Sequence, residues 1–295
     1  MNPKSELLAF LKEIIQKEAD EKSMNWLDEK SQKIQDSGSK NAFYLAFSQA
    51  SRFFSKDKLL LNPETKIKAN ALIDGFQPEF WNVLQTARAY LLLHFSLEKE
   101  EWLKAINQLF ETGDLYEQQA LYASLNLMPF SEEMLPRAIE GCRTNMTLVF
   151  DAIALNNPYA PSHFPELNWN QMVLKAVFMQ RPLYRIQQLD QRRNPALAEI
   201  ASDFAHERWA AGRNVMPELW RLVSPFINEK FMGDLEKVMS SEDLLEKKGG
   251  ALALHHSDFA PAKELLKKYP EFIHGIEKGA ISWEEIGQEY QETRV

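Results

Sequence analysis

Arginine is concentrated in the middle of the chain. Eight of the twelve arginines lie between Arg143 and Arg221, whereas Lys175 is the only lysine between Lys104 and Lys230. The planar guanidinium group binds carboxylates and phosphates through paired hydrogen bonds, and it is less strongly hydrated than the ammonium group of lysine. Segment 141–225 has nine basic and seven acidic residues, so it is positive while the rest of the chain is negative. This composition predicts a site for an anionic ligand.

Aromatic residues and histidines accompany these arginines. Stretch 156–166 contains three prolines, Tyr159 and His163, and we expect it to form a stiff loop. Such a loop could form the wall of a ligand site, or its aromatic side chains could anchor it to the core. Tryptophan side chains would supply apolar walls. The predicted ligand-binding set is Tyr159, His163, Trp169, Arg181, Arg185, His206, Arg208, Trp209 and Arg213.

Three further residue patterns could do chemistry, but each has a simpler structural interpretation. Asp203, His206 and Glu207 would share one helical face, yet no HExxH motif and no second histidine cluster accompanies them, so we expect no metal and no cofactor. Asp151 lies in an apolar run and needs a partner if buried. We predict a structural ion pair between Asp151 and Arg208. Phosphate-binding glycine loops and nucleophile elbows are absent from the sequence.

Composition narrows the class of protein. The 295 residues carry a net charge of −8, which argues against nucleic-acid binding and against anionic membranes. Cys142 is the only cysteine, so a disulfide framework is excluded and a reducing compartment fits best. The sequence shows no signal peptide and no run of about 20 apolar residues. We therefore expect a cytoplasmic protein that does not insert into membranes.

Apolar residues recur with helical spacing nearly everywhere, whereas alternation typical of strands is almost absent. Asn62-Pro63 and Asn194-Pro195 are typical of helix starts, and Gly113 and Gly212 of helix ends. We predict an all-α fold of about sixteen helices in an irregular, HEAT-like solenoid without a sheet. The array would form one continuous domain, in which residues 1–140 are the N-terminal helices, 141–228 the central segment with the site, and 229–295 a C-terminal cap.

The central segment resembles the EboA family. The similarity runs from Asn156 to Arg213 and continues through PELWRLVSPF at Pro217–Phe226. It includes an NP pair, a WNQMVLKA helix, a PL-x-RI segment and a DxAHERWAAGR helix end, here Asn157-Pro158, Trp169–Ala176, Pro182–Ile186 and Asp203–Arg213. The resemblance implies a helical, non-catalytic component of a bacterial gene cluster for traffic or maturation of a secondary metabolite. It also implies protein partners from that cluster, among them a prenyltransferase-like membrane protein.

Three functions stay open at this point. The first is a binding or scaffold protein that holds an anionic metabolite or a partner enzyme, and the arginines and the aromatic loop favour it. The second is a lyase or isomerase for an isoprenoid-like precursor, with His163 or His206 as acid or base. It requires these groups to converge in one pocket. The third is an assembly factor without a small ligand, which predicts a large exposed apolar patch.

Overall fold

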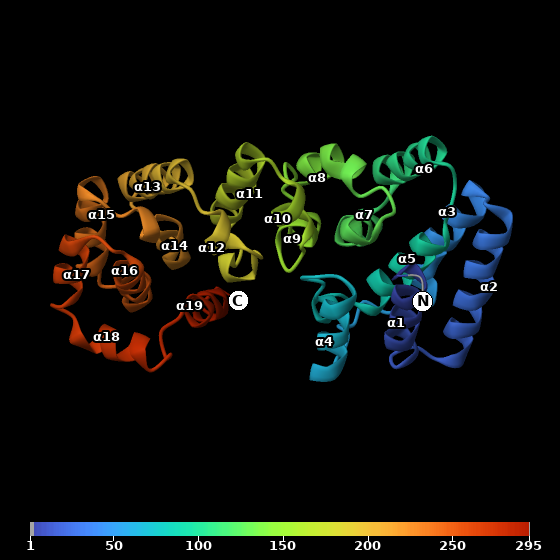
Figure 1. Ribbon diagram of the computed structural model, residues 1–295, viewed down its shortest axis with the longest axis horizontal. Helices are drawn as coiled ribbons and strands as arrows, with labels where there is room; N and C mark the ends of the chain where they lie inside the picture. The colour runs from blue at the N-terminus through green and yellow to red at the C-terminus, as the bar shows by residue number, and fades with distance from the viewer. Residues whose placement is uncertain (1–2, 295) are drawn as a thin grey trace. The chain divides into compact units, whose positions relative to one another are not determined.

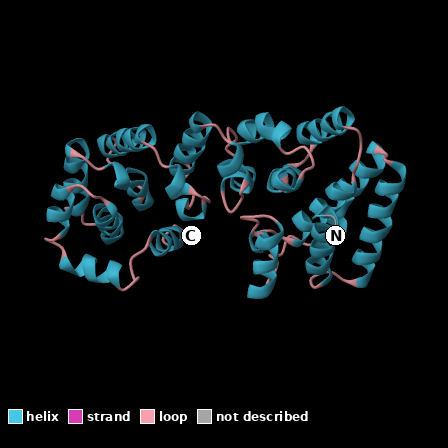
Figure 2. Ribbon diagram, viewed as in Figure 1, coloured by secondary structure: helices cyan, strands magenta, loops and turns pink. Residues whose placement is uncertain are grey.

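The computed structural model describes residues 3–294 and consists of helices joined by short connections (Figures 1 and 2). Within these residues the structure has nineteen α-helices, seven 3₁₀ helices and no strand, apart from one isolated bridge between Lys58 and Asn82. The all-α prediction is confirmed. The α-helices outnumber the expected sixteen because very short ones such as α12 (Leu189–Arg192) and α14 (Trp220–Val223) have too few residues to show a period.

The chain divides into two compact units, residues 1–164 and 165–295. This boundary falls inside the central segment 141–228 that the sequence singled out. The α-helices of the first unit are α1 (Pro3–Gln16), α2 (Glu21–Ser37), α3 (Lys40–Gln49), α4 (Pro63–Leu72), α5 (Val83–His94), α6 (Lys99–Thr112), α7 (Leu115–Ala123), α8 (Leu135–Gly141), α9 (Thr147–Ala154) and α10 (Tyr159–His163). Its 3₁₀ helices are η1 (Ala50–Arg52), η2 (Pro78–Phe80), η3 (Leu125–Leu127) and η4 (Glu132–Met134).

Helix α5 is the core of the first unit. It contacts α1, α2, α3 and α7, and α7 in turn contacts α9, as Figure 1 shows. Every residue from Val83 to Leu93 is therefore buried, including polar ones. Asn82 and Gln85 form a capping box that starts the helix and satisfies two backbone amides.

The second unit contains α11 (Glu166–Phe178), α12, α13 (Pro195–Ala210), α14, α15 (Glu229–Met239), α16 (Leu244–His256), α17 (Ala260–Leu266), α18 (Pro270–Glu277) and α19 (Trp283–Glu292). Its 3₁₀ helices are η5 (Leu183–Arg185), η6 (Pro217–Leu219) and η7 (Ser224–Phe226). Helix α16 contacts α14, α15, α17, α18 and α19. A Cβ on Gly249 would lie 2.5 Å from the carbonyl oxygen of Pro217, so glycine allows η6 to approach α16 this closely.

The helix boundaries predicted from capping residues are confirmed. Asn62 and Asn194 each accept a hydrogen bond from the backbone amide of the third residue of the helix that follows, and proline is the first residue of both helices. Gly113 ends α6, and Gly212 follows α13 with a φ of 65°. Stretch 156–166 was expected to form a stiff loop, and this was wrong for its middle part. Residues 159–163 form α10, because proline is tolerated in the first turn of a helix.

Candidate functional site

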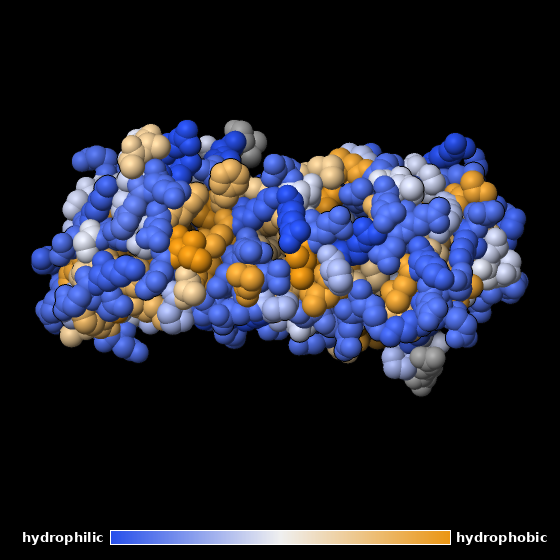
Figure 3. Space-filling view, turned by 90° about the horizontal axis from the view of Figure 1, so that it is seen from above, coloured by the Kyte–Doolittle hydropathy of each residue, from blue (hydrophilic) through white to orange (hydrophobic). Residues whose placement is uncertain are grey.

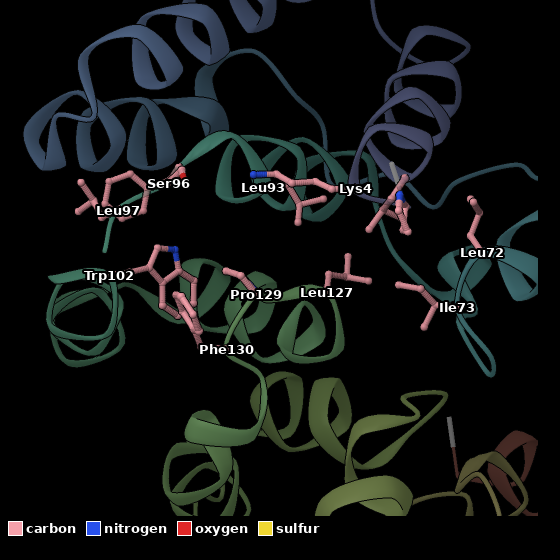
Figure 4. A pocket seen from close by; sticks show the side chains of 13 residues that line it. Lys4, Leu72, Ile73, Leu93, Ser96, Leu97, Trp102, Leu127, Pro129 and Phe130 are labelled. Carbon is pink, nitrogen blue, oxygen red and sulfur yellow. The ribbon is translucent and has the colours of Figure 1, made fainter. Parts of the chain in front are cut away.

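The first unit contains an apolar pocket of about 280 Å³ at the ends of several helices (Figure 4). Helix α1 supplies Lys4 and Leu7, the chain after α5 supplies Ser96 and Leu97, and α6 supplies Trp102. The complete lining is Pro3, Lys4, Leu7, Leu72, Ile73, Leu93, Phe95, Ser96, Leu97, Trp102, Leu127, Pro129 and Phe130. An engineered apolar cavity of about 150 Å³ holds benzene, so this pocket has room for a ligand roughly twice that size.

Polar side-chain groups are few in this pocket. Lys4 is exposed at the surface, yet partial burial of its ammonium group lowers its pKa. Trp102 is wholly buried, and its Nε1 has no acceptor among the described residues. Its ring packs edge-on against Phe130, with the ring centroids 5.5 Å apart. Ser96 adds one hydroxyl group near the surface. A concave apolar lining with a few polar groups is typical of small-molecule sites.

This lining is suited to binding rather than to acid–base catalysis. Lys4 is the only ionisable side chain among the thirteen, and none is acidic. General acid–base chemistry needs a titratable group within hydrogen-bond reach of the reacting atom, usually with a partner that tunes it. The pocket therefore offers apolar contact and recognition of one polar group.

The two candidate residues of the first unit pack into its core. Tyr159 is wholly buried, and its hydroxyl donates to the carbonyl of Ser131 at 2.6 Å. Burial raises the pKa of Tyr159. The half-buried ring of His163 lies beside it, with centroids 4.4 Å apart. Asn157 reinforces this turn by donating to the carbonyls of Tyr122 and Ala152. These contacts support the interpretation of this stretch as an anchor.

The remaining candidates lie in the second unit. Trp169 of α11 is wholly buried, and the guanidinium group of Arg192 lies 4.4 Å from its ring. Arg181 and Arg185 are half-buried, on either side of the start of η5. A role in a ligand site stays a proposal for Trp169, Arg181 and Arg185.

His206, Arg208 and Trp209 lie on α13 and interact with their neighbours there. His206 Nε2 is 2.6 Å from Asp234 Oδ1, and Ser202 donates to Asp234 Oδ2 at 2.6 Å. The side chain of His206 is nevertheless 54% exposed. The half-buried Trp209 lies under the ammonium group of Lys237, 4.0 Å from the ring centroid. Ser202 and His206 both bind the carboxylate of Asp234 rather than each other. These three side chains therefore join α13 to α15, and Ser202 and His206 do not form a nucleophile–base pair.

Arg208 and Asp151 do not have the burial on which their predicted pairing was based. The guanidinium group of Arg208 donates twice to the carbonyl of Asn214, at 3.0 and 2.9 Å, which closes the turn after α13. Asp151 is half-buried rather than enclosed in the core. The apolar run around it forms α9, which is only eight residues long. Arg213 is exposed.

Two acidic groups of the second unit were not predicted from the sequence. Asp190 accepts two hydrogen bonds from Arg221, both at 2.8 Å. Burial raises the pKa of Asp190, but Arg221 and the neighbouring Arg193 and His256 together outweigh this effect and lower it. Glu218 is wholly buried and accepts from the backbone amides of Leu183 and Tyr184. Complete burial raises the pKa of Glu218 to about 8, although the two amides and Arg221 act against it. Only the pattern Pro-Glu-Leu-Trp hinted that Glu218 stands among apolar residues.

Sequence patterns gave no signal for the apolar pocket. Its lining comes from separate stretches of chain, and each contributes apolar residues that could equally fill a core. Residues 3–294 contain no cluster of three histidine, cysteine or acidic side chains that could hold a metal ion. No helix within the same residues combines the length and the apolar composition needed to cross a bilayer.

A comparison with known families gives one match. The model of a family described as metabolite traffic protein EboA matches residues 7–224, about three quarters of the chain. The match covers the stretches that form the pocket from Leu7 onward, as well as the arginine-rich segment. No curated protein and no solved structure matches the chain.

Proposed function

We propose that this chain, which belongs to the EboA family of metabolite traffic proteins, acts as a non-catalytic binding protein that holds a small metabolite. The apolar pocket of the first unit is the observation that carries this proposal. It is concave, it is lined almost entirely by apolar side chains, and it has no acid–base pair. A traffic protein must bind its cargo and release it unchanged, and such a pocket provides binding without reactive groups.

Two observations favour binding over catalysis. In the enzymatic alternative, His163 or His206 acts as an acid or a base in an enclosed site. His206 is more than half exposed and is bound to Asp234, and the ring of His163 lies tilted against a core tyrosine. Turnover of a secondary-metabolite precursor that depended on either histidine would contradict the proposal.

A scaffold role for a protein partner is the second candidate, and α11 favours it. Leu167 and Phe178 are both more than two-thirds exposed, and they lie about three turns apart on the same face of this helix. Figure 3 shows apolar patches set among hydrophilic residues on the face seen from above. A partner from the same pathway, including a membrane protein, could dock on such residues while the chain itself stays in the cytoplasm.

Native mass spectrometry of the full chain, purified gently from its own host, tests the proposal. Three proteins are compared: the wild type, Ser96→Trp, and the double variant Arg181→Ala/Arg185→Ala. Ser96 is exposed at the pocket, so a tryptophan there fills the cavity without replacing a core residue. Ser48→Trp on the exposed side of α3 is the matched control.

Each outcome leads to a different conclusion. A small molecule that is bound to the wild type and to the Ser48→Trp control, but is lost from Ser96→Trp, supports the pocket. Loss from the arginine variant alone would place the ligand in the second unit, at the residues predicted from the sequence. A wild type without any small ligand but with a co-purifying protein would favour the scaffold role.

A further inference from the structure

Among the thirteen described residues of the pocket lining, the accessible polar side-chain groups lie only at the mouth. Lys4 and Ser96 are exposed to solvent, whereas Leu7 and Leu93 are buried. The indole nitrogen of Trp102 has essentially no accessible surface, so a ligand in the pocket does not reach it. A charged or hydrogen-bonding group enclosed in the interior would lose its hydration without gaining a side-chain partner, which is unfavourable. The interior is therefore suited to the apolar part of a ligand.

The lining has the form of a slot rather than of a round cavity. Figure 4 shows two rows of side chains that face each other and a third group at one end. The first row is Leu97, Ser96, Leu93 and Lys4, the second row is Trp102, Phe130, Pro129 and Leu127, and the end group is Leu72 and Ile73. The first row comes from α1, the end of α5 and the chain after α5, and the second row comes from α6 and from η3 with the chain after it. A thin, extended ligand between two such walls makes dispersion contacts with both of them along its length.

The volume of the slot sets the size of such a ligand. The pocket measures about 280 Å³. An engineered cavity of about 150 Å³ holds the six carbons of benzene, which corresponds to roughly 25 Å³ for each carbon. The pocket therefore has room for a chain of about eleven carbons. A longer chain would extend from the mouth into water.

We propose that the pocket binds a chain-shaped hydrocarbon group of about eleven carbons, and that it recognises this chain rather than a charged head group. This inference rests on the proposed function and specifies its ligand class. Apolar contact selects a ligand by its length and shape, because each added methylene group gains affinity only while it still enters the slot. The polar end of the ligand stays at the mouth beside Ser96, where water hydrates it.

Competition of 1-alkanols against radiolabelled 1-octanol bound to the full chain tests the selection by length. Alcohols of six to fourteen carbons share one uncharged head group and differ only in the chain. We expect the affinity to rise about fourfold with each methylene group. It should level off near about eleven carbons. Decanoate should bind no more tightly than decanol, and 1-adamantanol, a compact alcohol of ten carbons, should bind more weakly by about fourfold or more, the contribution of one methylene group.

Two substitutions at the end of the slot test where the chain lies. Ile73→Trp shortens the slot and should move the levelling-off to a shorter alcohol, whereas Leu72→Ala lengthens the slot and should move it to a longer alcohol. Ile67→Trp and Leu60→Ala are the matched controls, since both residues are exposed and neither lines the pocket. The thermal midpoint of each variant shows whether it is folded.

Four results would overturn the inference. An affinity that stays constant from six to fourteen carbons would show that chain length is not recognised, and tighter binding of decanoate than of decanol would show a partner for the charge. An unchanged levelling-off in folded Ile73→Trp and Leu72→Ala would place the chain elsewhere. If labelled octanol does not bind, the chain-shaped ligand class is excluded. The proposed function is then decided separately by native mass spectrometry, which detects a bound small molecule of any class.

Discussion

Arg88 of α5 is wholly buried, and its Nη2 lies 3.6 Å from Oε1 of Glu117 on α7. Its Nε donates to the carbonyl of Phe47, but neither Nη atom has a hydrogen-bond acceptor among residues 3–294. Burial lowers the pKa of Arg88, while the charge of Glu117 acts in the opposite direction. Glu117 also caps α7 by accepting from the amide of Asp114. The buried ion pair between Arg88 and Glu117 therefore joins α5 and α7.

Replacing one member of this pair should destabilise the fold. In Arg88→Met the Glu117 carboxylate is left buried without its counter-charge, and we expect the free energy of unfolding to fall by about 3–5 kcal/mol. The double variant Arg88→Met/Glu117→Gln should recover much of this loss, because glutamine is neutral and still accepts from Asp114. Urea unfolding of the two variants measures both values. A double variant no more stable than the single one would show that packing, and not charge, sets the cost.

Glu218 should make stability fall as pH rises. Its pKa is about 8 in the folded protein and near 4.5 when unfolded, so the native state binds more protons between these values. The free energy of unfolding should then decrease with pH, at up to about 1.4 kcal/mol per pH unit from this group. We expect the stability of the wild type to fall relative to that of Glu218→Gln from about pH 5.5 to about pH 8. A difference that stays constant over this range would show that Glu218 is ionised throughout.

Gly287 on α19 is needed for the packing around Glu218. A Cβ at this position would lie 2.2 Å from Cδ1 of Tyr184 and 2.9 Å from Cδ of Glu218. Gly287→Ala should cost about 1–3 kcal/mol of stability through overpacking, less the gain of up to about 1 kcal/mol in helix propensity. Gly233→Ala on α15 is the control, since nothing lies within 4 Å of its Cβ, and it should be neutral or stabilising. Equal thermal midpoints for the two variants would contradict the close packing.

The geometry of Arg221 should matter more than its charge. Arg221→Lys keeps the positive charge near Asp190 but cannot form both 2.8 Å hydrogen bonds. Because the Asp190 side chain is 41% exposed, we expect a loss of only about 1 kcal/mol. Arg213→Lys at an exposed position should leave the melting temperature unchanged. Calorimetry of both variants at low and high salt checks this, and the Arg221→Lys loss should change little with salt, because both side chains carry the same charge.

Local signals were enough to predict the helices from the sequence. Asn194 and Pro195 begin α13. The asparagine side chain accepts a hydrogen bond from a free backbone amide, and proline has no backbone N–H that would need an acceptor. Both effects act within one turn of the helix. Gly212 follows the same helix because its backbone adopts a positive φ. The periodic burial of apolar residues follows from the same local geometry.

Contacts between distant segments decided everything that concerns the site. The side-chain amide of Asn170 exchanges hydrogen bonds with that of Asn194, which only the packing of α11 on α13 brings within reach. In the sequence, Arg88 resembles any other arginine of a helix. It is buried only because four helices surround α5 in the folded unit. The pocket forms where Lys4, Ser96 and Trp102 meet, although Lys4 lies several helices away from the other two along the chain. Sequence periodicity tells which face of a helix is buried, but only tertiary packing determines whether the partner face fills that space or leaves a cavity.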